Sequence, residues 1–178
     1  LLLALLQRER TGKGAYVEVS LEEAALTGLI NQASNWLMAK QVAQPIGTLH
    51  PNIAPYGELF TCADGDRIVL AVGSNAQFKA LCSVLDLSDL AHDQHFSSNA
   101  KRVTNRNVLA QLLAPAIASQ TREALLDQFT LLQVPAGAVN TLDQALSSTT
   151  AARMTLEEMI DGVRTIRISG NAFRIESY

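Results

Sequence analysis

The residues best suited to chemistry stand in a row in one proline-rich stretch: Gly47, Thr48, Leu49 and His50. A histidine ring can donate a hydrogen bond to a carboxylate and can change charge near neutral pH, so His50 is a candidate for orienting an acidic substrate. The same side chain could equally cap a turn. The residues alone leave both interpretations open, a substrate loop and a structural turn.

Two other patterns suggest ligand binding less strongly. His92 and His95 flank Asp93, and such a trio could in principle recruit a metal ion. Because their spacing differs from the i, i+4 pair of helical zinc motifs, we interpret them as part of a helix end or loop and expect no metal site. A Gly-Lys-Gly segment at 12–14 lies after an expected helix and before an expected strand, the reverse of the order in which a helix N-terminus holds phosphate, so we reject a phosphate loop.

Cysteines and basic residues add no catalytic signature. Cys62 and Cys82 lack the local spacing of a zinc site and are too few for a disulfide framework, so we expect two buried thiols. Lys101, Arg102 and Arg106 form one basic cluster without interleaved aromatic residues, which we interpret as a solvated helix face or as local ion pairs. We name no catalytic residue from these patterns.

The composition is that of a folded, soluble protein. The 178 residues are 48% hydrophobic and 17% charged, which excludes disorder as the main state, and a net charge of −3 gives no overall attraction to nucleic acid or an anionic membrane. The opening apolar run, residues 1–6, is far shorter than the ~20 residues that span a bilayer. We therefore expect a cytoplasmic protein that binds neither nucleic acid nor membrane.

Regular elements surround the proline-rich stretch on both sides. Before it, polarity patterns and a Ser20–Glu23 capping box predict a helix at 1–10 ending at Gly12, a strand at 15–20 and a helix at 21–40. After it they predict a hairpin (58–62 and 67–72), helices at 75–85, 102–118 (kinked or shortened by Pro115), 121–131 and 142–146, and strands at 134–140 and 163–168. Since the first helix has no visible start and the last strand is followed by an abrupt end, we expect a fragment of a longer chain.

Several blocks, in order, resemble the class III CoA-transferases, the family that includes formyl-CoA transferase. The matching blocks are residues 4–14 with 16–21, His50 to Tyr56, Thr61, Asp64-Gly65, 71–73, 77–78 and 81–82, then Phe96, Asn99, Arg102-Val103, Asn105-Arg106 and Leu109, and finally 134–137 with 139–141. The resemblance covers nearly the whole chain. It implies an α/β fold in which the end of a Rossmann-like large-domain segment is followed by a linker and an α+β small domain.

The resemblance also implies a division of the chain. Residues 1–40 would be a remnant of the large domain, 41–57 the interdomain linker and substrate loop, 58–161 the small domain, and 162–178 the start of a return linker. In the family, two chains are threaded through each other as an interlocked homodimer, so a homodimer is expected of the full-length protein.

The family moves CoA from an acyl-CoA to a carboxylic acid through an aspartyl mixed anhydride. Its nucleophilic aspartate lies upstream of Leu1, so the chain alone is expected to be inactive, with no bound cofactor and with a CoA thioester as substrate. The stretch from Gly47 to His50 matches the family's glycine-rich substrate loop but keeps one glycine where formyl-CoA transferase has several. This departure argues against oxalate as the acceptor and favours a bulkier acceptor, such as a dicarboxylate.

Two alternatives remain open at this stage. One is the racemase branch of the same superfamily, similar to α-methylacyl-CoA racemase, in which general bases move an α-proton without CoA transfer. The other is a non-catalytic small-domain module for binding or assembly. Finding the upstream aspartate would favour the transferase, whereas acyl-CoA binding without turnover would favour the module.

Overall fold

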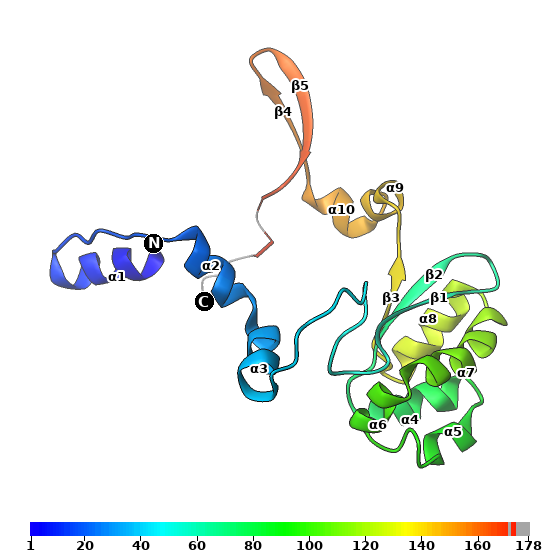
Figure 1. Cartoon of the computed structure of the whole chain (residues 1–178). Coiled ribbons are helices and arrows are strands. Elements are labelled where there is room, and N and C mark those ends of the chain that lie inside the picture. The colour runs from blue at the N-terminus through cyan, green and yellow to red at the C-terminus, as the bar shows by residue number, and fades with distance from the viewer. Residues whose placement is uncertain (171, 174–178) are drawn as a thin grey trace. The chain divides into compact units, whose positions relative to one another are not determined.

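The chain folds as two compact units, Leu1–Pro45 and Ile46–Tyr178, in a computed structural model that describes residues 1–170, 172 and 173 (Figure 1). The division falls inside the proline-rich stretch. The return linker expected at 162–178 lies partly outside the described residues. Within the described part, no helix is both long enough and apolar enough to cross a membrane.

The N-terminal unit consists of three short helices, α1 (Leu2–Thr11), α2 (Leu21–Gly28) and α3 (Ile30–Ala39). As predicted, α1 ends at Gly12, which adopts the left-handed conformation with φ 68°. Ser20 caps α2, since its Oγ accepts a hydrogen bond from the backbone N–H of Glu23 at 3.4 Å.

Two predictions for this unit are wrong. Residues 15–20 form no strand, because no neighbouring strand pairs with them, and an extended segment needs such a partner to become part of a sheet. The helix expected over 21–40 is broken between Gly28 and Ile30, where Ile30 has φ 38°. Gly28 is a poor helix former, and the Thr27 hydroxyl donates to the carbonyls of Glu23 and Ala24, a pattern that bends helices.

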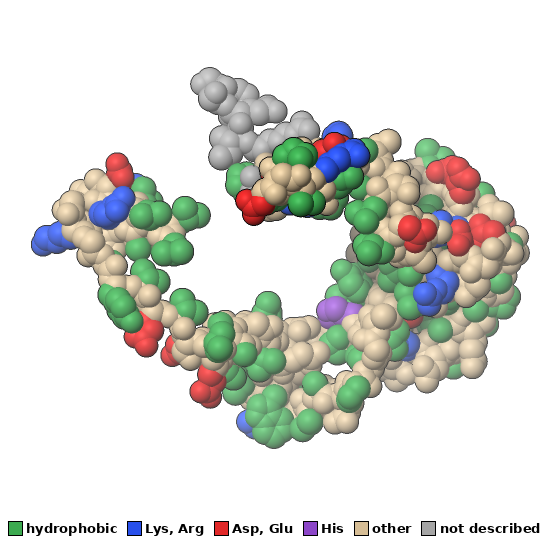
Figure 2. All heavy atoms as spheres, turned by 90° about the horizontal axis from the view of Figure 1, so that it is seen from above, with side chains coloured by type: hydrophobic (Ala, Val, Ile, Leu, Met, Phe, Trp, Pro, Cys, Tyr) green, Lys and Arg blue, Asp and Glu red, His purple; other side chains and the backbone are tan. Residues whose placement is uncertain are grey.

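No helix of the N-terminal unit has a buried residue. Large apolar side chains lie at its surface, and Figure 2 shows such side chains in green. Leu37 is 65% exposed and Met38 87% exposed. Large exposed apolar patches in soluble proteins normally mark surfaces that bind a partner or that aggregate, so this unit is poorly suited to remain isolated in water.

The C-terminal unit is built on a three-stranded antiparallel sheet in the order β1-β2-β3. The strands are β1 (Tyr56–Thr61), β2 (Arg67–Ala71) and β3 (Ala136–Val139). The hairpin prediction is confirmed, with Gly65 at φ 80° in the turn between β1 and β2. Figure 1 shows the helices α4 to α8 grouped beside this sheet: α4 (Asn75–Val84), α5 (Ser88–His92), α6 (Asn99–Thr104), α7 (Arg106–Ala118) and α8 (Arg122–Leu131).

A continuous hydrophobic core joins the sheet to these helices. It includes residues that are fully buried: Ile68, Leu70, Val72, Leu81, Cys82, Leu113, Ile117 and Leu125. Pro115 does not shorten α7, which continues to Ala118 because the neighbouring Leu113 and Ile117 hold its last turn in the core. The helix predicted over 102–118 instead begins at Asn99 and is interrupted at Asn105.

The remaining elements follow β3. They are α9 (Leu142–Leu146), α10 (Thr149–Met154) and a hairpin of β4 (Thr155–Ile160) and β5 (Val163–Ile168). The predictions of α9 and β5 are confirmed. Thr141 and Gln144 form a capping box on α9, and the pairs Glu157–Arg164 and Glu158–Arg167 cross between the hairpin strands. Together the described elements make a mixed fold of helices and small antiparallel sheets.

We predict that the 178-residue chain self-associates at micromolar concentration. Replacing Leu29 and Leu37 by Glu should shift its sedimentation toward the monomer, because both side chains are about half exposed or more on one apolar surface. The control is Leu131→Glu, which places the same charge on an 81% exposed leucine of the other unit. A monodisperse wild-type monomer in analytical ultracentrifugation would contradict this prediction.

Candidate functional site

The loop that holds the candidate residues folds back onto the start of β1. The Thr48 hydroxyl donates to the carbonyl of Gly57 at 2.7 Å, and the His50 backbone N–H donates to the carbonyl of Tyr56 at 2.8 Å. Gly47 has φ 65°, a left-handed conformation that favours glycine. Gly47 and Thr48 are exposed, whereas Leu49 and His50 are half-buried.

The imidazole of His50 is held by two contacts. Its Nδ1 accepts a hydrogen bond from the backbone N–H of Asn52 at 3.1 Å, and its ring lies edge-on to Tyr56 with the centroids 5.3 Å apart. A ring nitrogen that accepts a hydrogen bond carries no proton, so the neutral ring bears its proton on Nε2. The loop therefore presents an oriented Nε2–H donor, the group needed to bind a carboxylate or a carbonyl oxygen.

Side chains from α6 and α7 also bind the backbone of the loop. Asn99 donates through Nδ2 to the carbonyl of Asn52 at 2.7 Å, and its Oδ1 accepts from the Ala54 N–H at 3.1 Å. Arg102 is completely buried, and its Nε donates to the carbonyl of Ala54 at 2.9 Å. Its Nη1 donates to Oδ1 of Asn75 and to the carbonyl of Phe96, and its guanidinium lies over the ring of Phe78.

Arg106 connects the loop to a buried carboxylate. Its Nη2 donates to the carbonyl of His50 at 2.5 Å and to that of Ile53, and its Nε lies 3.0 Å from Oε1 of Glu58. Glu58 on β1 is 5% exposed, and in the described structure its oxygens make no hydrogen bond of ordinary geometry, so the contact with Arg106 is an ion pair. Burial raises the pKa of Glu58, while nearby backbone N–H groups and the charge of Arg106 partly oppose the rise.

The sequence favours a solvated helix face or local ion pairs for the basic cluster. A solvated face is wrong for two of its three members, and Arg106 does form an ion pair, but with Glu58, which is distant in sequence. Lys101 is exposed, but Arg102 and Arg106 point into the unit and pair with groups about 50 residues away in sequence. Sequence patterns gave no role to Glu58 and placed Asn99 only in a block that resembles the family. The available signal was the loop itself, because a proline-rich segment in a folded domain has carbonyls that need donors from elsewhere.

The other candidates are not brought together into a site. Asp93 accepts from His95 Nδ1 at 2.9 Å, while His92 Nδ1 contacts the carbonyl of Ser88. Among the described residues, no group of three or more His, Cys, Asp or Glu could hold a metal. Cys62 and Cys82 are buried free thiols, as predicted, and burial raises the pKa of Cys82 to about 11.

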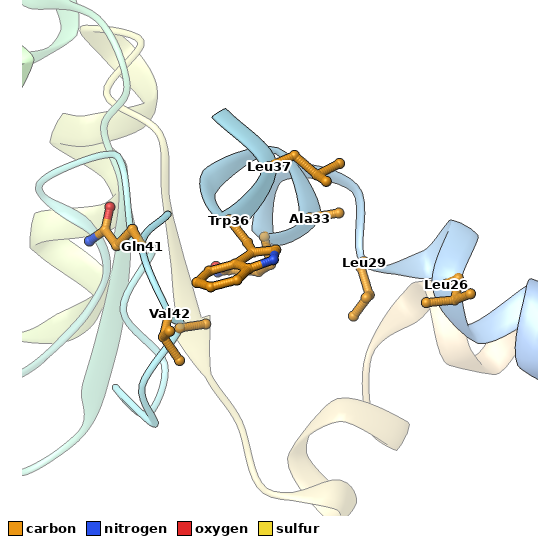
Figure 3. Close-up of a pocket in the computed structure, with 9 residues that line it drawn as sticks. Leu26, Leu29, Ala33, Trp36, Leu37, Gln41 and Val42 are labelled. Atoms are coloured by element: carbon orange, nitrogen blue, oxygen red, sulfur yellow. The ribbon is translucent and has the colours of Figure 1, made fainter. Parts of the chain in front are cut away.

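A separate groove of about 600 Å³ lies in the N-terminal unit, and Figure 3 shows its lining. Trp36, Leu26, Leu29, Leu37 and Val42 make most of its wall. The lining holds no ionisable side chain, since its polar members are two glutamines. This groove has the character of a packing surface, and the candidate groups for chemistry lie in the His50 loop.

Comparison with known proteins decides the family. The model for CoA-transferase family III matches residues 1–177. The chain belongs to this family. The resemblance in the sequence blocks is thereby confirmed.

Named relatives of this family III chain are CoA-transferases. The "Succinate--glutarate CoA-transferase" of Agrobacterium fabrum is 31% identical, with 91% of this chain and 42% of the relative covered. The "Acetyl-CoA:oxalate CoA-transferase" of Acetobacter aceti is 32% identical, with 98% and 44% covered. A crystal structure of a CAIB/BAIF family protein from Brucella suis superposes with a TM-score of 0.66 at 32% identity, covering 98% of this chain and 45% of that one. The chain thus spans about two fifths of the length of the curated relatives it matches.

We predict that Gly57→Ala disrupts the contact between Thr48 and the start of β1. A Cβ at Gly57 would lie 1.9 Å from the carbonyl oxygen of Thr48, and its φ of 86° is strained for other residues. The free energy of unfolding should fall by about 3 kcal/mol or more in denaturant titration. Gly65→Ala is the matched control, because its φ is 80° but nothing lies within 4 Å, so strain alone should cost about 1 kcal/mol. Equal losses in the two variants would exclude the clash.

Glu58 gives a pH-dependent prediction. Because burial raises its pKa above the ordinary value of 4.5, the folded state keeps this proton more tightly than the unfolded state does. The contribution of Glu58 to stability therefore declines as pH rises from about 4.5 through the raised value, and is constant above it. Measured by denaturant titration between pH 4 and 8, the stability of the wild type relative to Glu58→Gln should fall with rising pH. A difference that rises with pH would contradict the raised pKa of Glu58.

Proposed function

We propose that this chain is part of an acyl-CoA:carboxylate CoA-transferase. The family match over residues 1–177 carries the proposal, together with relatives named for CoA transfer between small carboxylic acids. In this reaction an aspartate carboxylate attacks the thioester carbonyl, the C–S bond breaks, and CoA leaves as a thiolate while an acyl-aspartyl anhydride forms. That aspartate is expected upstream of Leu1, so the 178-residue chain alone should be inactive.

Within this proposal the segment from Gly47 to His50 is the substrate loop. The Nε2–H of His50 is the donor that would bind a carboxylate oxygen of the acceptor acid, or the developing charge on the thioester carbonyl. Thr48 and Leu49 would help to enclose the acid and exclude water, which would otherwise hydrolyse the anhydride. Backbone anchoring through Gly57 and Tyr56 supports this role, because a positioned donor needs little reorganisation during the reaction.

The acceptor that we propose is a dicarboxylic acid longer than oxalate. A single glycine in the loop leaves less room for backbone closure on a very small acid than several glycines would. The Agrobacterium relative, named for succinate and glutarate, supports this choice, and the Acetobacter relative makes oxalate the competing acceptor. The CoA thioester is the second substrate, and no bound cofactor takes part in the proposed chemistry.

The domain assignment follows the same family. We propose that residues 1–40 belong to a Rossmann-like large domain, 41–57 to the linker and substrate loop, 58–161 to the small domain, and 162–178 to a return linker. The change of unit after Pro45 supports a linker in this region. The full-length protein would be an interlocked, cytoplasmic homodimer, in which the apolar surface of the N-terminal unit would be covered.

An acyl-transfer assay by mass spectrometry tests the function. The 178-residue chain is compared with a chain extended upstream through the expected aspartate, using succinyl-CoA and a panel of glutarate, succinate and oxalate. New acyl-CoA should form only with the extended chain. If neither chain transfers CoA, α-proton exchange would indicate the racemase branch, and acyl-CoA binding without turnover would indicate a binding module.

His50 is tested in the extended chain. His50→Ala removes one hydrogen bond to a charged group, so kcat/KM for the acceptor acid should fall about 10- to 100-fold. His92→Ala is the matched control, because His92 is exposed on α5 and lies outside the proposed loop. If both variants keep wild-type activity, His50 has no part in substrate binding.

A further inference from the structure

We infer that Arg106 is the positioning residue of the substrate loop: its guanidinium, held by the Glu58 carboxylate, fixes the backbone at His50 and Ile53 and so sets where the His50 Nε2–H lies. The inference rests on the proposed function of the loop. It assigns to Arg106 a role through His50 and no contact with substrate.

Of the three side chains from α6 and α7 that hold the loop, Arg106 is the one that binds His50, and the other two bind further along the loop. Asn99 binds the backbone at Asn52 and Ala54, and Arg102 binds the carbonyl of Ala54. The bond from Arg106 Nη2 to the His50 carbonyl is 2.5 Å long, and the second bond of the same nitrogen holds Ile53. Both ends of the short turn that includes Asn52 are therefore fixed to one rigid planar group.

That turn determines the orientation of the imidazole. The Asn52 N–H donates to His50 Nδ1, so the ring follows the backbone between its own carbonyl and Ile53. If the turn opens, this bond is lost, and the ring is free to rotate and to exchange its tautomer. The hold of Arg106 on the two carbonyls thus acts on the position of Nε2, the proposed substrate contact.

Glu58 in turn holds Arg106. The side chain of Arg106 is 13% exposed and that of Glu58 is 6% exposed, so their attraction is only weakly screened by water. The Nε that faces Glu58 is a different nitrogen from the Nη2 that binds the loop, so one guanidinium serves both contacts at once. A lysine has a single ammonium group and cannot reproduce this fork, which makes Arg106→Lys a charge-conserving test.

Arg122 provides a matched control within the same unit. Its side chain is 19% exposed, its Nη2 lies 2.9 Å from Oδ2 of Asp66, and its Nη1 donates to the carbonyl of Val139. It therefore combines a carboxylate partner with a backbone carbonyl, as Arg106 does, but ties the β1–β2 turn to β3. Arg122→Lys should weaken the unit by a comparable mechanism without reaching the His50 loop.

The test is hydrogen exchange of the 178-residue chain, followed by mass spectrometry of peptides over residues 46–57 and over α4. In Arg106→Lys the loop peptide should exchange about tenfold faster, with α4 protected as in the wild type. In Arg122→Lys the loop peptide should keep its wild-type rate. Wild-type exchange of the loop in Arg106→Lys, or equal acceleration in both variants, would overturn the inference.

Glu58→Gln serves as a second variant if Arg106→Lys does not fold. It keeps a side chain of nearly the same shape and leaves both loop bonds of Arg106 possible while removing the charge that holds its guanidinium. The loop peptide should exchange faster than in the wild type while α4 remains protected. An unchanged loop in this folded variant would overturn the role of the ion pair.

A kinetic arm separates this inference from the proposed function. In the extended chain, Arg106→Lys should raise KM for the acceptor acid about tenfold and change kcat less, because a displaced donor first weakens binding. A loosened loop together with this KM change supports both the inference and the function. A loosened loop with unchanged kinetics would leave the hold of Arg106 on the loop standing and reject the loop as the substrate site.

Discussion

The carbonyl groups of a proline-rich, largely half-buried segment need donors, and this need organises the loop and the helices that hold it. Prolines at 51 and 55 contribute no N–H, so the segment satisfies only some of its carbonyls by pairing with itself, through Thr48 and His50. The other donors come from elsewhere in the unit. Arg106 donates to the carbonyls of His50 and Ile53, Asn99 to that of Asn52, and Arg102 to that of Ala54. The backbone N–H groups of Val72 and His50 donate to the carbonyls of Pro55 and Tyr56, and the Thr48 hydroxyl donates to that of Gly57.

Arginine suits this task because one planar group carries five N–H donors in fixed directions. Arg102 uses its donors on the loop, on α4 and on the segment before α6, and Phe78 covers its face. Arg106 donates to the loop through Nη2 and forms an ion pair with Glu58 on its Nε side. Buried charges are costly to desolvate, so such an arrangement contributes less to net stability than to holding one defined geometry.

The two units differ in how far their apolar side chains are buried. In the C-terminal unit, apolar residues from the sheet and from α4, α7 and α8 are buried against one another. In the N-terminal unit the apolar stripes of the helices stay at the surface, around the groove of Trp36. A stripe with helical periodicity indicates a face suited to packing against another apolar surface.

Local signals in the sequence determined the Gly12 helix end, the Asp-Gly hairpin and the helix at 142–146. Each of these depends on residues close together in the chain, so a short window contains its cause. The family followed from ordered blocks spread over nearly the whole chain, and the two buried thiols from the small number and the spacing of the cysteines. Only the tertiary structure decided that 15–20 has no strand partner and that Arg102 and Arg106 turn inward to a loop about 50 residues away. These outcomes depend on long-range partners, and the polarity of a single side chain does not reveal whether water or a distant carbonyl will satisfy it.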